Sequence, residues 1–277
     1  METVAIVGVG LIGGSFALAL RAAGFSGRIL GVSSEATLRK ALERGVIEEA
    51  ATLAEAAGRA DLLYLAQPIA RILDTLRRLE PLVRPGALVT DAGSTKRAIA
   101  AAGALLARAQ FLGGHPMAGK EKRGVEEAEA GLFAGRPYVL TPPSPEALRT
   151  DAALEFRLWL ERIGARVLTL APEEHDRVVA LTSHLAQLAS TALATTVAEA
   201  VPDRVDVAGP GLVDSTRLAL SPYELWRDIL ATNSAEIDRA LAAYIARLEH
   251  LRANLRTREM QREFETAAAL AARLRRA

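Results

Sequence analysis

The sequence predicts an α/β chain in two parts: a doubly wound, mostly parallel sheet over residues 1–171 and an all-helical domain over residues 172–277. Two observations predict this organisation. Before Pro172, short apolar runs alternate with Ala- and Leu-rich stretches of helical length, which is typical of successive β-α-β units. After Pro172, the strand pattern stops and apolar residues recur at helical spacing. Each part is long enough to bury a core of its own.

The expected strands are apolar runs bounded by glycine, proline or polar residues. They are Val4–Val7, Ile29–Val32, Leu62–Leu65, Ala87–Thr90, Phe111–Gly113, Tyr138–Thr141 and Arg166–Leu170. A proline cluster at residues 142–145 interrupts the chain, but a helical stretch, Glu146–Ile163, and one more strand follow it. We therefore place the domain boundary near Pro172.

The second part is predicted to be helical and to form a homodimer. One helix is expected over Asp176–Ala200 and another after Asn233. In the latter, apolar residues recur in alternating steps of four and three, at Ile237, Leu241, Tyr244, Leu248, Leu251 and Leu255. Such a stripe packs either within its own small domain or against a second copy. Because little else in this half covers it, we favour the dimer.

Composition excludes several classes of protein. The chain has no cysteine, which rules out disulfides, thiolate zinc sites and a cysteine nucleophile. The histidines lack metal-ligand spacing with acids, so we expect no metal. A net charge of +1 leaves no broad basic field for nucleic acid. No apolar run approaches the roughly 20 residues that cross a bilayer. We expect a cytoplasmic protein without membrane or nucleic-acid partners.

The segment GVGLIG at residues 8–13 follows an expected strand and opens an expected helix. In that context the first glycine permits a tight turn, the second lets the backbone approach a pyrophosphate, and the third lets helix and strand pack closely. The helix N-terminus offers free N–H groups to the phosphates. The sequence therefore predicts a Rossmann-type domain that binds NAD or NADP. The expected contacts are Gly8, Gly10, Leu11, Ile12, Gly13, Gln67 and Asp91.

The end of the second strand bears on the choice between NAD and NADP. An acid there would bind the ribose hydroxyls of NAD and repel a 2′-phosphate, but the chain has Ser33 and Ser34. Arg39 or Lys40 can add positive charge, whereas Glu35 works against a phosphate. The balance slightly favours NADP. The alternative, that the serines only cap the next helix, is compatible with either cofactor.

Two further segments end strands at the same edge of the sheet. GGHPMAG holds His115 in a stiff glycine- and proline-rich frame, and a neutral histidine suits proton abstraction near pH 7. DAGSTK offers the Ser94 hydroxyl and the Lys96 ammonium to the same crevice, where Ser94 can orient His115. Lys96 can equally be a surface charge in a first helical turn.

The chain resembles the prephenate and arogenate dehydrogenases of tyrosine biosynthesis over essentially its whole length. The segments GVGLIGGS, DAGSTK, GGHPMAG, PEEHD, TSHL and DSTRLALSPYELWRDI occur in the order seen in that family. The resemblance implies an oxidative decarboxylation of prephenate or arogenate. In this reaction NAD(P)⁺ takes hydride from the ring carbon that bears the hydroxyl, CO₂ leaves and the ring becomes aromatic.

The resemblance also implies roles for individual residues. His115 matches the catalytic residue that draws the proton from the ring hydroxyl, Ser94 its orienting partner, and Arg217 the clamp for a substrate carboxylate. Further contacts with the substrate are implied at Glu121, Lys122, His175, Ser183, His184 and Trp226. Trp226 is expected to help close the pocket, in its own subunit or across a dimer.

One departure from the family bears on the substrate. Some members that use prephenate have a second histidine three residues after the Ser-His pair, where this chain has Gln187. A neutral amide should tolerate the ammonium group of arogenate better, so Gln187 favours arogenate slightly.

Two kinds of function compete with this interpretation: another reductase of similar architecture and a sensor that binds a dinucleotide. A β-hydroxyacid dehydrogenase uses a lysine on the helical domain, but the last lysine of this chain is Lys122. An imine reductase would leave the GGHPMAG loop and Arg217 without a purpose. A sensor that binds a dinucleotide without turnover is the rival from a different class.

Overall fold

The computed structural model describes residues 1–120 and 122–276 and contains an eight-stranded sheet in the order β3-β2-β1-β4-β5-β6-β7-β8. The strands are β1 (Thr3–Val7), β2 (Arg28–Val32), β3 (Glu49–Ala50), β4 (Leu62–Leu65), β5 (Leu88–Asp91), β6 (Gln110–Pro116), β7 (Pro137–Thr141) and β8 (Arg166–Thr169). Neighbours from β3 to β6 pair in parallel, and β7 runs antiparallel to β6. The predicted mostly parallel sheet is confirmed. The sequence missed β3, because two residues show no periodicity.

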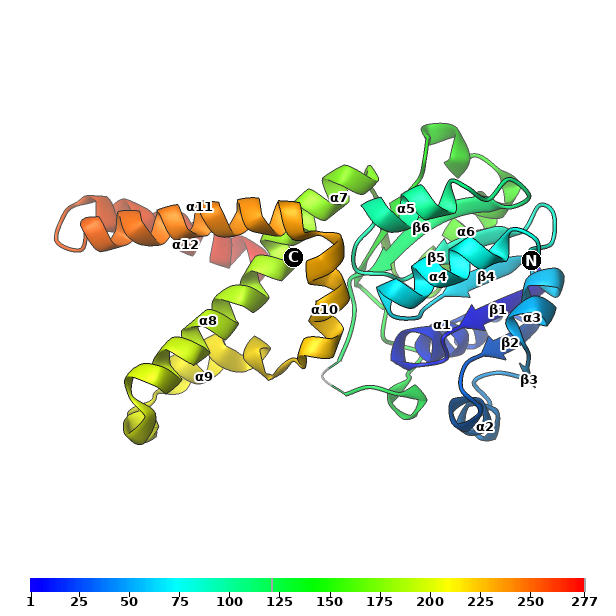
Figure 1. Ribbon diagram of the computed structural model, residues 1–277, viewed down its shortest axis with the longest axis horizontal. Coiled ribbons are helices and arrows are strands. Elements are labelled where there is room, and N and C mark those ends of the chain that lie inside the picture. Colours follow the sequence, from blue (N-terminus) through cyan, green and yellow to red (C-terminus); the bar gives the residue numbers. More distant parts are fainter. Residues whose placement is uncertain (121, 277) are drawn as a thin grey trace.

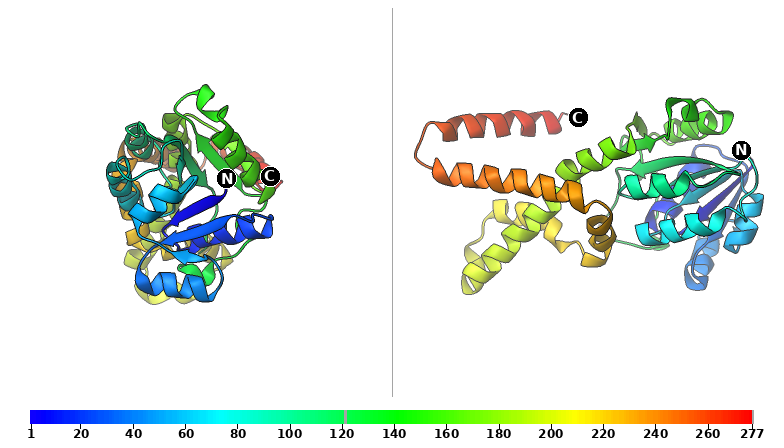
Figure 2. Two further views of the ribbon diagram at one scale, coloured as in Figure 1. Left: turned by 90° about the vertical axis from the view of Figure 1, so that its right-hand side faces the viewer. Right: turned by 45° about the horizontal axis from the view of Figure 1, so that its top comes forward.

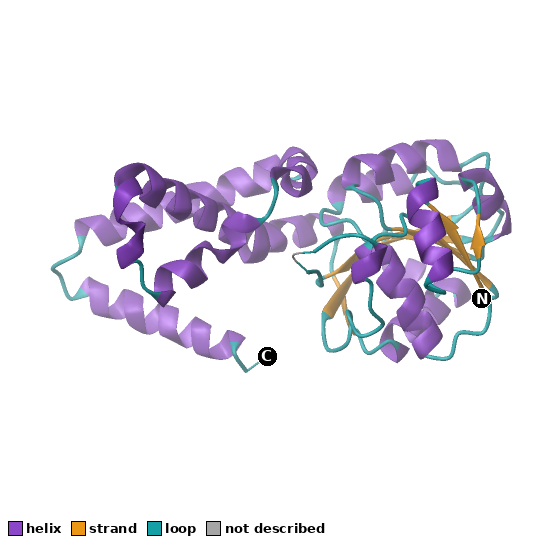
Figure 3. Ribbon diagram, turned by 90° about the horizontal axis from the view of Figure 1, so that it is seen from below, coloured by secondary structure: helices purple, strands orange, loops and turns teal. Residues whose placement is uncertain are grey.

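Helices cover both faces of the sheet (Figures 1 and 3). One face packs under α1 (Leu11–Ala22), α2 (Glu35–Glu43) and α6 (Asp151–Arg162). The other packs under α3 (Leu53–Arg59), α4 (Ile69–Leu79) and α5 (Arg97–Gly103). The strand order reverses between β1 and β4, so the connections leave these two strands toward opposite faces. A ligand crevice is expected outside their carboxyl ends.

A cluster of aromatic rings centres on Phe16 of α1, and Phe16 is fully buried. Its ring stacks on Tyr64 with centroids 4.0 Å apart and meets Phe133 and Phe156 edge-on at 6.4 and 6.3 Å. Offset and edge-on pairs of this kind add to the free energy gained by burying the rings. The cluster holds α1, and with it the glycine loop that precedes α1, against the sheet.

The second domain is helical and extends away from the sheet (Figures 1 and 2). One long helix consists of α7 (Pro172–Val179), a π-helical turn (Ala180–His184) and α8 (Leu185–Ala200). The helices that follow are α9 (Pro210–Thr216), α10 (Tyr223–Thr232), α11 (Ser234–Ala253) and α12 (Glu259–Leu274). A widened π turn inside a helix often accompanies a functional site.

The long helix corrects one expectation from the sequence. By length and composition, Pro172–Ala200 could cross a bilayer, with a mean hydropathy of 1.2 and 28% of its most apolar window buried. The expectation that no segment is long enough was therefore wrong. The same helix buries His175, Asp176, His184 and Gln187 within the chain.

Much apolar surface of the helical domain lies uncovered in a single chain. On α11, Ile237 is buried against the sheet domain, but Leu248 farther along the stripe is 46% exposed. Leu255 lies beyond the end of α11, so it does not extend the predicted stripe. None of the described residues of α12 is buried, and Phe264 on this helix is 70% exposed.

Replacing Phe16 by alanine should lower the free energy of unfolding by about 3–5 kcal/mol, because the cavity left among packed aromatic rings cannot collapse fully. Urea denaturation followed by circular dichroism measures the change. Leu105→Ala, at a side chain that is 76% exposed, serves as the control and should change stability by less than about 0.5 kcal/mol. A loss below 1 kcal/mol for Phe16→Ala would contradict the role given to the cluster.

Candidate active site

Three neighbouring cavities share lining residues along the carboxyl edge of the sheet. The first, of about 530 Å³, lies at the glycine loop. The second, of about 420 Å³, contains His115 and shares Gly10 and Gln67 with the first. The third, of about 630 Å³, lies against the helical domain and shares Lys122 and Leu225 with the second. The three form one continuous site from the glycine loop to the helical domain.

The glycine loop leaves room where a pyrophosphate would approach. Gly8 has a φ of +98°, and a Cβ there would lie 2.7 Å from the carbonyl oxygen of Ala66. A Cβ on Gly13 would lie 2.2 Å from the carbonyl oxygen of Gly8, so this glycine allows α1 to pack on the loop. A Cβ on Gly10 would meet nothing within 4 Å. Only the Gly10 position opens into free space, which is the shape that a dinucleotide requires.

The start of α1 also suits an anion. Gly10 is the N-cap and provides no side-chain cap, and the first turn contains no acid. The first backbone N–H groups of α1 are therefore available to phosphate oxygens. Leu11 and Ile12, both predicted contacts, line the second cavity. These features fit a bound dinucleotide.

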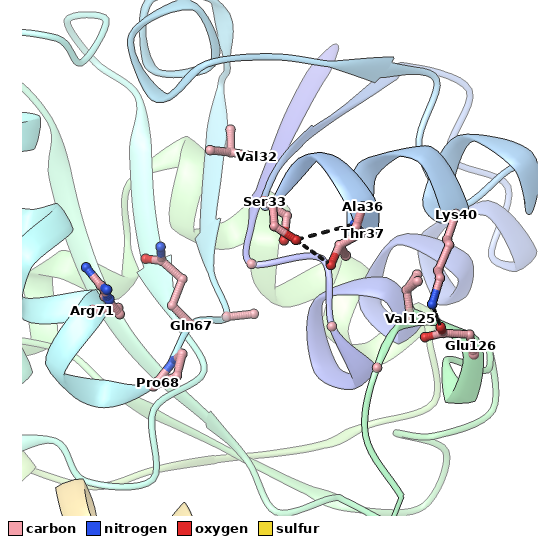
Figure 4. Close-up of a pocket in the computed structure, with 15 residues that line it drawn as sticks. Val32, Ser33, Ala36, Thr37, Lys40, Gln67, Pro68, Arg71, Val125 and Glu126 are labelled. Carbon is pink, nitrogen blue, oxygen red and sulfur yellow. Dashed lines mark hydrogen bonds and ion pairs between the residues drawn. The ribbon is translucent and has the colours of Figure 1, made fainter. Parts of the chain in front are cut away.

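Polar side chains surround the far end of the first cavity (Figure 4). Ser33 lines it, and Ser34 caps α2 by accepting a hydrogen bond from the backbone N–H of Thr37 at 3.4 Å. The capping role considered for the serines is thus confirmed for Ser34. Lys40 reaches across the cavity and forms an ion pair with Glu126.

Four further polar or charged side chains divide between the first cavity and a neighbouring cavity. Gln67 and Arg71 lie on the opposite side of the first cavity from Ser33 (Figure 4). Glu35 and Arg39 line a separate neighbouring cavity on the outer side of α2. The acid that was expected to oppose a phosphate therefore does not face the first cavity.

Asp91 corrects a prediction, because it does not reach the cofactor cavity. Its residue is fully buried, and its carboxylate accepts hydrogen bonds from the backbone N–H of Gly93 at 2.8 Å and of Gly114 at 3.1 Å. Lys96 is fully buried too, forms an ion pair with Asp91 and donates to the carbonyl oxygen of Gly114 at 2.7 Å. Lys96 is thus neither a cavity residue nor a surface charge. The pair holds the backbone on which His115 sits.

His115, at the end of β6, is part of a chain of three side chains. Its Nδ1 lies 2.8 Å from Nε2 of His175, and Nδ1 of His175 lies 2.9 Å from Oδ1 of Asp176. All three residues are at most 8% exposed, and His115 lines the second cavity. The catalytic candidate from the sheet domain is therefore held by residues from α7 of the helical domain.

Burial lowers the pKa of His115 well below its ordinary value, and His175, Lys96 and His184 act in the same direction. Burial also lowers the pKa of His175, against the opposing effect of Asp176. Both rings are therefore neutral at pH 7. With Nδ1 engaged by His175, Nε2 is the nitrogen of His115 that remains for a ligand.

Ser94 differs in part from its prediction. It lines the second cavity together with His115, as expected. Within residues 1–120 and 122–276, however, the hydrogen-bond partner of the His115 ring is His175 and not Ser94. The expected orienting role of Ser94 is not seen, because the Nδ1 of His115 points toward the helical domain.

Four of the eight predicted substrate contacts line the third cavity. They are Lys122, Gln187, Arg217 and Trp226. Lys120 and Arg123 add further positive charge, and Glu127 is the acid among the described residues that line the cavity. A cavity with this lining suits a substrate that carries carboxylates.

Two further predicted contacts, His184 and Ser183, do not line the three cavities. His184 is buried in the π turn, where its ring meets Trp226 edge-on at 5.9 Å, and burial lowers its pKa to about 4. Glu121 lies outside the described residues.

Sequence reasoning missed two carboxylates that join the two domains and an amide that supports one of them. The Asp176 carboxylate binds the start of α5, and the Asp228 carboxylate accepts a hydrogen bond from the backbone N–H of Ala70 at 2.9 Å in the first turn of α4. Asn233 donates to the carbonyl oxygen of Asp176 at 2.9 Å and lies 3.3 Å from Nδ1 of His184. Asp176 and Asp228 belong to the quoted segments PEEHD and DSTRLALSPYELWRDI, which was the signal available for them.

No group of three or more His, Cys, Asp or Glu residues with metal-binding geometry occurs among the described residues.

Two family models match the chain. The nucleotide-binding domain of prephenate dehydrogenase matches residues 16–169, and the dimerization domain of prephenate dehydrogenase matches residues 171–269. A prephenate dehydrogenase from Lactococcus lactis subsp. cremoris is 34% identical over 84% of the chain, and the match spans 65% of that relative's length.

Two solved structures resemble the whole chain. The prephenate dehydrogenase of Aquifex aeolicus in complex with hydroxyphenyl propionate and NAD⁺ has a TM-score of 0.86 and 33% identity, covering 99% of this chain and 97% of the other. The arogenate dehydrogenase of Synechocystis has a TM-score of 0.84 and 33% identity, covering 98% and 99%.

Replacing Gly10 by valine should abolish NAD⁺ and NADP⁺ binding while the fold persists, because the new side chain fills only the space left for the pyrophosphate. Titration calorimetry measures binding, and thermal unfolding measures the fold. Gly131→Val is the matched control, since a Cβ there also meets nothing within 4 Å. Retained dinucleotide affinity in Gly10→Val would show that the pyrophosphate binds elsewhere.

Proposed function

The chain belongs to the prephenate dehydrogenase family, and we propose that its site oxidises and decarboxylates a cyclohexadienyl acid, with hydride transfer to NAD(P)⁺, in tyrosine biosynthesis. The observation that carries this proposal is the position of His115. It lines the cavity between a loop that fits a dinucleotide and a cation-rich cavity on the helical domain. A neutral histidine at that point can accept the proton of the ring hydroxyl while hydride leaves the ring carbon that bears this hydroxyl.

Each residue of the site has a separate task in the proposed reaction. Gly10 and the N–H groups at the start of α1 would hold the pyrophosphate of the dinucleotide, which when bound would supply the hydride acceptor. His115 accepts the proton of the ring hydroxyl at Nε2. Arg217 binds a substrate carboxylate in the third cavity. As the hydroxyl loses its proton and the carbon its hydride, the bond to the ring carboxylate breaks, CO₂ leaves, and that electron pair completes the aromatic ring. His115 then returns the proton to the phenolate oxygen, which gives the phenol product.

Arogenate is the proposed substrate, and the orientation of Gln187 supports this choice. The Thr191 hydroxyl donates to the backbone carbonyl of Gln187 at 3.0 Å, so its oxygen must act as the acceptor toward the Gln187 side chain. Gln187 Nε2 therefore donates to Thr191, at 3.2 Å. The carbonyl oxygen of the amide remains as an acceptor for an ammonium group such as that of arogenate.

NADP is the proposed preferred cofactor. Ser33 stands where an acid would repel a 2′-phosphate, and the hydroxyl of Thr37 and the ammonium of Lys40 line the same end of the cavity. Glu35 lines a different cavity. Glu126 holds Lys40 in an ion pair, so binding of a phosphate must exchange one anionic partner of Lys40 for another.

A homodimer through the helical domain is the proposed assembly. The matched dimerization domain and the uncovered apolar side chains of α11 and α12 support it. A single chain gives α12 no core of its own, and a second copy of the domain would supply one. The cytoplasmic location, the boundary at residue 171 and the absence of membrane and nucleic-acid partners stay predictions.

A steady-state assay with prephenate or arogenate, each with NAD⁺ or NADP⁺, tests the proposals. We expect turnover, with the highest kcat/KM for arogenate and NADP⁺, and a shift toward prephenate in Gln187→His. The release of reduced nicotinamide measures the rate. A preference for prephenate or NAD⁺ would overturn the corresponding choice. No turnover in all four combinations, with dinucleotide binding intact, would contradict the reaction and favour a sensor.

His115→Asn should lower kcat by a factor of roughly 10²–10⁴, the usual contribution of one general base, and leave dinucleotide affinity unchanged. His250→Asn is the matched control, because His250 lies on α11 beside Glu263, away from the three cavities. Near-normal turnover in His115→Asn would remove the residue from its role.

A further inference from the structure

We propose that Asp176 is the positioning residue of this site: it determines which ring nitrogens of His175 and His115 carry the protons, and it does so only while the helical domain is seated on the start of α5. The inference about proton positions stands on the geometry, and its importance for turnover rests on the proposed role of His115 as the base.

Three N–H groups converge on the Asp176 carboxylate. Oδ1 accepts from the backbone N–H of Lys96 at 2.7 Å and lies 2.9 Å from Nδ1 of His175. Oδ2 accepts from the backbone N–H of Arg97 at 2.9 Å. The residue is 1% exposed, so these groups replace its water of hydration. A carboxylate satisfied in this way at the N-terminus of a helix is also favoured by the helix dipole.

The carboxylate is ionised in the folded chain. Burial alone would raise the pKa of Asp176, but the hydrogen bonds from His175 and from the backbone N–H groups of Arg97 and Lys96 outweigh it and lower the pKa below its ordinary value. An ionised carboxylate accepts hydrogen bonds and donates none. The nitrogen of His175 that faces it must therefore carry the proton.

The proton positions then follow one from another. A neutral His175 with its proton on Nδ1 has a bare Nε2, which can only accept. His115 must donate to it from Nδ1, across 2.8 Å. A neutral His115 with its proton on Nδ1 has a bare Nε2, which is the form needed to take a proton from a ring hydroxyl. If residue 176 donated to His175 instead, the protonated nitrogen of both rings would change from Nδ1 to Nε2. Nε2 of His115 could then no longer accept a proton.

The same carboxylate joins the two domains. Asp176 lies on α7 of the helical domain, whereas Lys96 and Arg97 begin α5 of the sheet domain. Asn233 holds the backbone carbonyl of Asp176 at 2.9 Å and so fixes α7 from the start of α11. If α7 moved away from α5, His115 would lose the partner that sets its protonated nitrogen. The contact between the two domains and the proton position that His115 needs as a base therefore depend on the same carboxylate.

The test compares Asp176→Asn with Glu236→Gln. Both positions are acids of the helical domain that meet Arg97: Asp176 binds its backbone N–H, and Glu236 binds its guanidinium at 3.1 Å. Among residues 1–120 and 122–276, the side chain of Glu236 binds Arg97 and Arg239 and makes no hydrogen bond or ion pair with a histidine, so Glu236→Gln tests the domain contact alone. With its amide nitrogen toward His175, an asparagine would donate to Nδ1 and reverse the proton positions along the chain. With its oxygen there, it would accept from His175 and from the backbone N–H of Lys96 as the carboxylate does, and the proton positions would stay.

Two readouts are needed. The chain has only four histidines, so ¹⁵N NMR of histidine-labelled protein can assign the protonated nitrogen of each ring. We expect Nδ1–H on His115 and His175 in the unsubstituted protein and Nε2–H on both in Asp176→Asn. We expect kcat to fall at least about 10²-fold in Asp176→Asn with little change in dinucleotide affinity, and to stay within about twofold in Glu236→Gln.

Each outcome decides the proposal. Nε2–H on His115 in the unsubstituted protein would overturn it, and this measurement needs neither substrate nor a variant that folds. A loss of kcat in a folded Asp176→Asn without a change of proton positions, or an equal loss of kcat in Glu236→Gln, would reduce Asp176 to a structural contact and overturn it too. If the assay with the four substrate and cofactor pairs shows no turnover, the proposed function fails while the NMR result still decides the role of Asp176.

Discussion

The hydrogen bonds that converge on the Asp176 carboxylate are the constraint on which the site depends. The carboxylate sits at the start of α5, binds His175 and through it reaches His115. Leaving a buried charge without these partners would cost several kcal/mol, so the arrangement permits little displacement. A single buried group thereby relates the position of the helical domain, the orientation of the His115 ring and the nitrogen that is free to react.

A second buried charge supports His115 from within the sheet domain. Lys96 and Asp91 are fully buried, and together they bind the backbone N–H and carbonyl oxygen of Gly114, next to His115. His115 is thus fixed through its backbone by one ion pair and through its ring by His175. Both arrangements exclude water, and burial is also the main reason that the histidine stays neutral.

The strand order explains why one chain can bring cofactor and substrate together. The reversal between β1 and β4 opens the crevice at the glycine loop, and β6 ends beside it with His115. The helical domain closes the other side with Arg217, Gln187 and Trp226. The Asp228 carboxylate at the start of α4 adds a second contact of the same kind as Asp176, from helical domain to helix N-terminus.

The sequence by itself determined the sheet, the two-part organisation, the glycine loop and the histidine at the end of β6, because each leaves a local signal in periodicity or in glycine and proline placement. Through motifs matched to a family, it also grouped Lys122, Gln187, Arg217 and Trp226, which line the third cavity. Only the tertiary structure decided that Asp91 and Lys96 are buried and support the backbone beside His115. It also decided that His175, and not Ser94, is the partner of the His115 ring, and that Asp176 in turn binds His175. These roles depend on which side chains meet across two domains, and a contact between residues 80 positions apart leaves no pattern in the local sequence.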